Sequence, residues 1–249
     1  MTKTTETILA RVAALEKALP AAPAALKMPH GAELAAWIDH TLLKPEATPA
    51  QIEKLCAEAR EYHFATVCIN PVYVPLAEKL LRDSGVPVCA VIGFPLGATT
   101  PELKAMEAGR VAEMGAAEID MVIHIGALKA DDAARALEDV QAVSDACHAR
   151  GARLKVILEM ALLTRHEKIL GCVVSQAAAA DFVKTSTGFG PGGATVEDVA
   201  LMRAIVGEKM GVKAAGGIRS LADARTMVAA GANRLGASAG VAILREELL

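Results

Sequence analysis

Three charged residues stand inside segments that otherwise suit buried β-strands. Lys184 closes the apolar run in DFVKTSTGFG, Lys213 lies in GVKAAGGIR, and Asp120 lies in EIDMVIHIG. A charged side chain on a fully buried strand costs several kcal/mol unless it is paired. A single strand lysine is more often an edge or snorkelling residue, and a buried lysine–aspartate pair can be purely structural. Two lysines and an aspartate on separate strands instead favour a polar site.

The chemistry of amines gives a reason for two lysines in one site. An ordinary lysine, with a pKa of about 10.4, is almost fully protonated at neutral pH. A second ammonium nearby, together with desolvation, lowers such a pKa and frees a lone pair for attack on a carbonyl. We therefore predict that Lys184 forms a Schiff base, that Lys213 activates it, and that Asp120 moves protons directly or through water.

Glycine clusters follow the last two candidate strands. Gly216 and Gly217 follow the seventh strand, and the segment 236–240 (GASAG) follows the eighth. The loops after strands seven and eight commonly bind phosphate in α/β barrels, because their backbone N–H groups and helix N-termini approach the anion. Arg219 can add a charge. The alternative is that these glycines only make tight turns. Further glycines follow Lys184, from Gly188 onward, and they form either a substrate contact or only a mobile connection.

The elements that position these residues alternate between apolar runs and helical patterns. Eight candidate strands are Ala36–His40, Ala65–Ile69, Val88–Ile92, Glu118–Ile123, Leu154–Leu158, Phe182–Lys184, Val212–Ala214 and Arg234–Gly236. Hydroxyl caps precede four of the intervening helices: Thr48, Thr164, Thr195 and Ser220. Glycines that can end helices are Gly85, Gly115, Gly151 and Gly231. This alternation predicts an α/β fold, a (β/α)8 TIM barrel. The alternative fold is an open doubly wound sheet. The absence of a GxGxxG motif in the first βα turn argues against this alternative.

The first 30 residues look like an addition to this barrel. Apolar residues recur there at helical spacing: Ile8, Leu9, Val12, Leu15 and Leu19. They predict one amphipathic helix, and the proline-rich stretch PAAPAALKMPHG predicts a linker. We expect a helical extension and linker over residues 1–30 and a catalytic barrel over residues 31–249.

Composition limits the partners that this chain can have. The formal net charge is −3, so nothing indicates a nucleic-acid partner. No stretch approaches the roughly 20 apolar residues that span a membrane. The five cysteines form no CxxC pair and stand at no zinc-ligand spacing. These observations predict a cytoplasmic protein without a metal site.

The same segments closely resemble the deoxyribose-phosphate aldolase family from about residue 34 to 240. The matching motifs are IDHTLLKP (38–45), FATVCINP (64–71), VIGFPLG (91–97), EIDMVIHIGALK (118–129), LKVILE (154–159), DFVKTSTGFG (181–190), VKAAGGIR (212–219) and NRLGASAG (233–240). DFVKTSTGFG and VKAAGGIR together are highly specific to that family.

The resemblance implies a class I aldolase, a carbon–carbon lyase that reversibly cleaves 2-deoxy-D-ribose 5-phosphate to D-glyceraldehyde 3-phosphate and acetaldehyde. It gives Lys184, Lys213 and Asp120 the roles proposed above, with no metal and no cofactor. It also implies substrate-binding or phosphate-binding positions at Asp39, Thr41, Cys68, Gly188, Gly216, Gly217, Arg219, Gly236 and Ser238. By the same analogy we expect a homo-oligomer, with a dimer favoured.

Three positions depart from the family pattern. Phe189 stands where some members have lysine, Ala239 where many have serine, and His124 where asparagine is common. The first two remove donors that could reach a phosphate. His124 is either a neutral exchange or a change at the mouth of the site.

Two other functions stay open. One is a different Schiff-base aldolase or a transaldolase, which would share the lysine but not the acetaldehyde donor. The other is a non-catalytic sugar-phosphate-binding barrel, which would keep the glycine loops but lose at least one of Lys184, Lys213 and Asp120.

Overall fold

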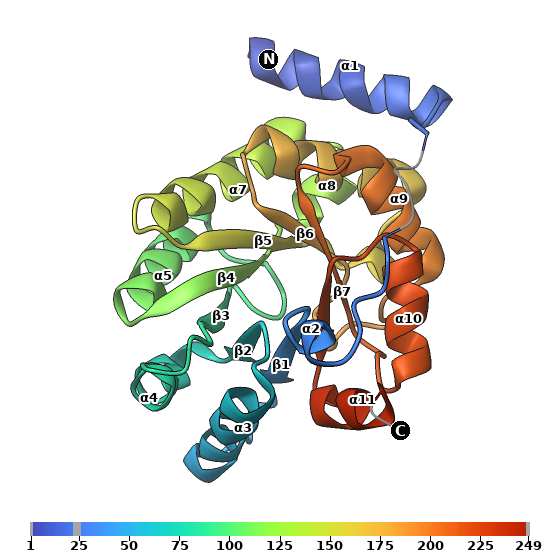
Figure 1. The fold of residues 1–249 in the computed structure, drawn as a ribbon. Coiled ribbons are helices and arrows are strands. Elements are labelled where there is room, and N and C mark those ends of the chain that lie inside the picture. The colour runs from blue at the N-terminus through green and yellow to red at the C-terminus, as the bar shows by residue number, and fades with distance from the viewer. Residues whose placement is uncertain (1, 22–25, 248–249) are drawn as a thin grey trace.

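The computed structural model describes residues 2–21 and 26–247 and shows a closed barrel of parallel strands (Figure 1). Eight strands follow one another around the barrel in chain order, and β8 closes on β1. They are β1 (Ile38–Leu42), β2 (Thr66–Ile69), β3 (Val88–Ile92), β4 (Ala116–Val122), β5 (Arg153–Ile157), β6 (Phe182–Lys184), β7 (Gly211–Ala215) and β8 (Arg234–Ala237). The predicted (β/α)8 fold is confirmed.

Helices return the chain between the strands and surround the barrel (Figure 1). The α-helices are α1 (Lys3–Lys17), α2 (Ala32–Ala35), α3 (Pro49–Tyr62), α4 (Val74–Leu81), α5 (Pro101–Glu113), α6 (Ile125–Lys129), α7 (Ala133–His148), α8 (Arg165–Ala177), α9 (Val196–Val206), α10 (Leu221–Ala229) and α11 (Gly240–Glu247). Two 3-10 turns are η1 (Pro71–Tyr73) and η2 (Met160–Leu162). Both faces of each strand are covered, which explains why the strands are rich in Val, Ile, Leu and Ala.

The ends of the helices follow the sequence signals. Four side chains accept a hydrogen bond from the backbone N–H three residues later: Thr48, Thr164, Thr195 and Ser220. Each satisfies one donor that the first helical turn leaves free. The four glycines expected after helices have positive φ, which favours glycine over other residues: Gly85, Gly115, Gly151 and Gly231.

The first strand differs from its prediction. It covers residues 38–42 rather than 36–40, because Leu34 and Ala35 are buried as part of α2. A short apolar run fits a helical turn as well as a strand, so periodicity could not place this boundary. Asp39 is therefore the second residue of β1 and lies well inside the barrel instead of at the strand end.

The expected N-terminal helix is α1, which lies outside the helical ring (Figure 1) and packs on α8 and α7. Ile8, Val12 and Leu15 are buried in this contact. The predicted linker includes residues 22–25, which lie outside the described residues, and the division at residue 30 stays a prediction. Among the described helices, none has the length and apolar character needed to cross a bilayer.

Candidate active site

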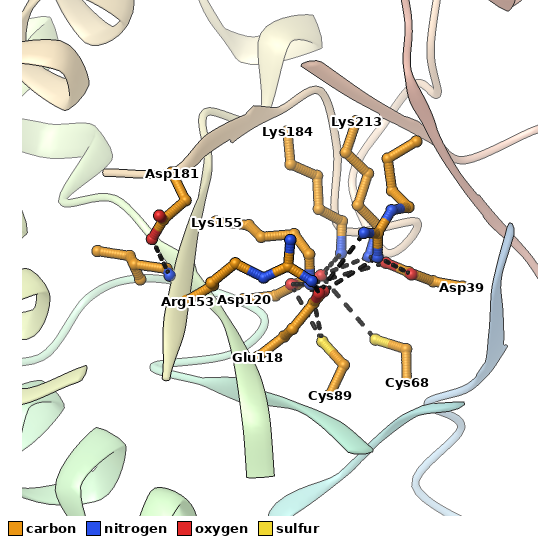
Figure 2. Close-up of polar contacts among 12 residues, drawn as sticks. Asp39, Cys68, Cys89, Glu118, Asp120, Arg153, Lys155, Asp181, Lys184 and Lys213 are labelled. Atoms are coloured by element: carbon orange, nitrogen blue, oxygen red, sulfur yellow. Dashed lines mark hydrogen bonds and ion pairs between the residues drawn. The ribbon is translucent and has the colours of Figure 1, made fainter. Parts of the chain in front are cut away.

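Asp120 is the centre of a charged cluster inside the barrel (Figure 2). Its Oδ2 accepts hydrogen bonds from Lys184 Nζ at 2.8 Å and from Lys213 Nζ at 2.7 Å. Its Oδ1 accepts one from Lys155 Nζ at 2.7 Å. All four residues are buried, with exposed fractions of 0 to 2%. The structure thus brings together the three residues predicted to carry the chemistry.

Strand register explains how residues so far apart in sequence meet. Lys184 is the direct neighbour of Lys213 across β6 and β7, and Asp120 is the neighbour of Lys155 across β4 and β5. Alternate side chains of a barrel strand point inward. Each of these residues takes an inward position, so the closed sheet directs all four toward one axis.

A second layer of charges lies beside the first, and sequence reasoning missed most of it. Glu118 Oε2 contacts Lys155 Nζ at 2.7 Å and an Arg234 guanidinium nitrogen at 3.0 Å. Asp39 Oδ2 contacts Lys213 Nζ at 2.5 Å, and its Oδ1 accepts from Arg234 at 2.7 Å. Glu118 and Arg234 stand at inward positions of predicted strands. A charged residue at such a position could have indicated from the sequence that each belongs to the cluster.

The charges of this cluster are fixed by their neighbours. Burial alone would raise the pKa of Asp120, but Lys155, Lys184 and Lys213 hold it well below its usual range. Burial alone would lower the pKa of Lys213, but the carboxylates of Asp120 and Asp39 raise it well above its usual range. In the resting protein Lys213 is therefore an ammonium, and Asp120 is a carboxylate that must accept a proton before it can donate one.

Two cysteines border the same cluster. Cys68 Sγ lies 3.9 Å from Asp120 Oδ2, and Cys89 Sγ lies 3.2 Å from Oδ1. A hydrogen bond from Cys89, with the charges of Lys213 and Lys184, outweighs burial and lowers the pKa of Cys68 to about 7. The ligand atoms of Cys68, Cys89 and Asp120 lie within 4.8 Å of one another. Both Asp120 oxygens already accept from lysines, so a cation would have to displace these bonds.

Above the cluster lies a cavity of about 340 Å³ that contains most of the predicted binding residues. Its lining includes Lys184 and seven of the predicted positions: Thr41, Gly188, Gly216, Gly217, Arg219, Gly236 and Ser238. Asp39 and Cys68 are fully buried beneath it and are not among its lining residues. Lys184 and the glycine loops therefore face one space.

The backbone conformation after β7 explains why glycine occupies these positions. Gly216 and Gly217 have φ of 89° and 84°, a region that side-chain-bearing residues rarely adopt. The carbonyl of Gly216 accepts from Ala194 N at 3.0 Å, and a Cβ at Gly193 would lie 2.3 Å from that carbonyl oxygen. The two glycine segments thus pack closely on each other at Gly193 and Gly216.

The three departures from the family pattern occupy different places. Phe189 lines the cavity and meets Phe94 edge-to-face, with ring centroids 5.3 Å apart. His124 Nδ1 accepts from Ala127 N at 2.9 Å and so caps α6, a task that asparagine also performs. Ala239 lines a separate outer cavity next to α11. Of the three, Phe189 is the one that changes the wall of the inner cavity.

An eight-stranded α/β barrel with a buried lysine–carboxylate cluster beneath a glycine-lined cavity has the architecture of a barrel enzyme. Comparison with known proteins makes the class more specific. The sequence model of DeoC/LacD family aldolases matches residues 34–249, and the chain belongs to this family. It is accordingly an aldolase, a lyase.

Individual relatives agree with this membership. The chain is 62% identical over 212 residues to a deoxyribose-phosphate aldolase of Streptococcus gordonii, covering 85% of this chain and 95% of that protein. It is 58% identical to the enzyme of the same name from Halalkalibacterium halodurans, over 86% of this chain and 96% of that protein. The solved deoxyribose phosphate aldolase of Aeropyrum pernix superposes with a TM-score of 0.82 at 36% identity, covering 96% of each chain.

Proposed function

We propose that this aldolase reversibly cleaves 2-deoxy-D-ribose 5-phosphate to D-glyceraldehyde 3-phosphate and acetaldehyde through an imine on Lys184. The observation that carries the proposal is the placement of Lys184. Its Nζ lies 2.8 Å from Asp120 Oδ2, and the residue lines the same cavity as the glycine loops after β7 and β8. The relatives named above, which bear the name of this activity, support the substrate.

The charge balance of the cluster supports a nucleophilic amine at Lys184. The carboxylates of Asp39, Glu118 and Asp120 contact four cationic side chains besides Lys184. These are Lys155, Lys213, Arg234 and the half-exposed Arg153. Lys184 shares Asp120 with Lys155 and Lys213. Because cations already outnumber carboxylates here, a further ammonium in the buried cluster is electrostatically unfavourable.

The reaction then follows in order. In the synthetic direction, the Lys184 amine adds to the aldehyde carbon of acetaldehyde. The hydroxyl of this adduct leaves as water with a proton supplied by the Lys213 ammonium, and a protonated imine remains. The methyl carbon next to it loses a proton to Asp120, directly or through Lys213 and water, and an enamine forms. The enamine carbon attacks the aldehyde carbon of glyceraldehyde 3-phosphate, and the new alkoxide takes the proton that Asp120 accepted. Water finally hydrolyses the imine, which releases the sugar phosphate, restores the Lys184 amine and returns a proton to Lys213.

The phosphate is held by glycine-rich loops that line the same cavity. Residues 216–219 and 236–238 follow β7 and β8, the two strands that come after the lysine-bearing β6 in the barrel, and Arg219 is exposed at the rim. Backbone N–H groups at a helix N-terminus bind anions well because no other partner satisfies them. With Phe189 in place of a lysine, phosphate binding rests mainly on these backbone groups.

Borohydride trapping tests the assignment. Reduction in the presence of acetaldehyde should attach an ethyl group to Lys184, identified by peptide mass spectrometry, and Lys184→Ala should abolish it. Lys129→Ala, which removes a surface lysine, is the control. Trapping of Lys184→Ala at the wild-type yield would overturn the assignment. Asp120→Asn should slow turnover by roughly 10²- to 10⁴-fold, the usual contribution of a general acid–base group.

Substrate comparison separates the rival aldolase functions. The retro-aldol rate on 2-deoxyribose 5-phosphate should far exceed the rates on ketose phosphates, and the reverse order would favour a different aldolase or a transaldolase. Addition of a chelator should leave the rate unchanged, because imine formation supplies the electron sink. A rate lost with the chelator and restored by a metal ion would contradict this mechanism.

We also propose a cytoplasmic homo-oligomer. The five cysteines are all free and buried, which suits a reducing compartment. The Aeropyrum pernix relative is a tetramer, which supports self-association of this chain. We still expect a dimer for this protein. Analytical ultracentrifugation measures the state directly.

A further inference from the structure

His40 lies directly behind the cavity and takes no part in the reaction proposed above. It follows Asp39 on β1, and because consecutive strand side chains point to opposite faces, Asp39 enters the barrel and His40 leaves it. His40 is 2% exposed, and its Nε2 lies 2.8 Å from Glu58 Oε2 on α3. Its ring stacks on Phe64, with centroids 4.6 Å apart and an interplanar angle of 26°.

The next contact of His40 is with the connection between β8 and α11. His40 is the register neighbour of Ala237, the last residue of β8, and α11 begins at Gly240. A Cβ at Gly240 would lie 3.0 Å from His40 Nδ1 and 2.9 Å from Phe64 Cζ. The backbone at the start of α11 therefore rests directly on the two rings, and only glycine permits so close an approach.

This connection has open space on two sides. Ser238 lines the inner cavity together with Lys184, and it also lines an outer cavity of about 700 Å³ next to His40, Glu58 and Arg245. With only Ser238 and Ala239 between strand and helix, the connection has little packing of its own. Its position depends strongly on the contact of Gly240 with the His40 and Phe64 rings.

We propose that His40, held by Glu58 and Phe64, is a positioning residue that sets the location of the Ser238–Gly240 backbone and thereby the affinity for the substrate's phosphate. The inference rests on the proposed function of these loops. Hydrogen bonds from a helix N-terminus to an anion weaken when the donors move by fractions of an ångström. His40 acts through packing and not through charge, since burial lowers its pKa and leaves the ring neutral at neutral pH.

Two variants disturb the contact from opposite sides. His40→Gln retains a donor for Glu58 but removes the ring, and Gly240→Ala pushes a methyl group into both rings. The matched control is Ala242→Ser, which changes an exposed side chain that lines the same outer cavity. Thermal unfolding identifies variants that are folded at the assay temperature.

The expected result is a split between phosphate binding and imine formation. The KM for 2-deoxyribose 5-phosphate and the Kd for inorganic phosphate, measured by calorimetry, should both rise about tenfold, the effect of weakening one charge-assisted hydrogen bond. The rate of borohydride trapping with acetaldehyde, which carries no phosphate, should stay within about twofold of wild type, well below that tenfold effect. Ala242→Ser should change neither quantity.

Other results overturn the inference. An unchanged KM and Kd in both folded variants would show that His40 does not position the connection. An equal loss of phosphate affinity and of imine trapping would show a general structural role. Failure of both variants to fold would likewise show a structural role rather than a positioning one. If the proposed function is wrong, the wild-type protein will not cleave the sugar phosphate. The calorimetric Kd for inorganic phosphate would still test the role of His40 in that case.

Discussion

Lys184 and Lys213 donate hydrogen bonds to the same oxygen atom, Oδ2 of Asp120, at 2.8 and 2.7 Å. The sharing follows from the register of β6 and β7, in which the two lysines are direct neighbours. Asp120 and Asp39 keep Lys213 charged, so the neighbour that Lys184 faces is an ammonium. A second ammonium beside it is unfavourable, which is the physical basis for reactivity at Lys184.

Removal of Lys213 should slow imine formation at Lys184. In Lys213→Met, Lys184 keeps Asp120 as a partner and loses the neighbouring positive charge. The rate of borohydride trapping with acetaldehyde should fall, and turnover should fall by roughly 10²-fold or more. Lys129→Ala, which removes a surface lysine, is the control. A wild-type trapping rate in folded Lys213→Met would show that Lys213 does not activate Lys184.

A cation at position 189 should tighten phosphate binding. Phe189 lines the cavity and is 48% exposed, so a lysine there can reach a bound phosphate from the solvent side. Phe189→Lys should lower the KM for 2-deoxyribose 5-phosphate by roughly threefold, as expected for a partly screened ion pair. High salt should reduce the gain. Phe189→Met removes the ring without adding charge, and an equal decrease in KM for this variant would refute the electrostatic explanation.

The buried ion pair Lys104–Asp139 offers a test of stability away from the site. Both side chains are fully buried, and Lys104 Nζ lies 2.8 Å from Asp139 Oδ1. Lys104→Met or Asp139→Leu alone should reduce the free energy of unfolding by about 3–5 kcal/mol, since each leaves one buried charge unpaired. The double variant should recover part of that loss, because the His124 N–H and the Val122 carbonyl still lose their bonds to Asp139 and Lys104. Urea unfolding measures all four proteins, and additive losses in the double variant would contradict the pairing argument.

The attachment of α1 should weaken as pH rises. Hydrogen bonds to Asp131 and Glu16 raise the pKa of His166, and Glu16 belongs to α1. A raised folded-state pKa gives stabilisation that is complete below the unfolded value of about 6.5 and is lost as pH rises through the folded value. Hydrogen exchange of α1 amides, corrected for the intrinsic pH effect, should show less protection at mildly alkaline than at mildly acidic pH. His166→Gln should abolish this difference, and a pH dependence that persists would implicate another group.

The sequence predicted the fold and the central chemistry because both leave local signals. Apolar runs, hydroxyl caps and glycines after helices mark a βα rhythm without any knowledge of distant contacts. Lys184, Lys213 and Asp120 were visible because charge inside a buried run is rare and costly. Their catalytic roles stay predictions, and the structure adds that all three meet at one carboxylate.

Tertiary structure alone decided the partners of these residues. Arg234 pairs with Asp39 across 195 positions of sequence, and this contact exists only because β8 closes on β1. The register of β1 was equally hidden, and it decides that Asp39 enters the barrel while His40 faces Gly240. A shift of one residue in a strand reverses the face of every side chain. Strand register and barrel closure are long-range properties, so the sequence singled out Lys184 as the candidate amine while the folded barrel decided its neighbours.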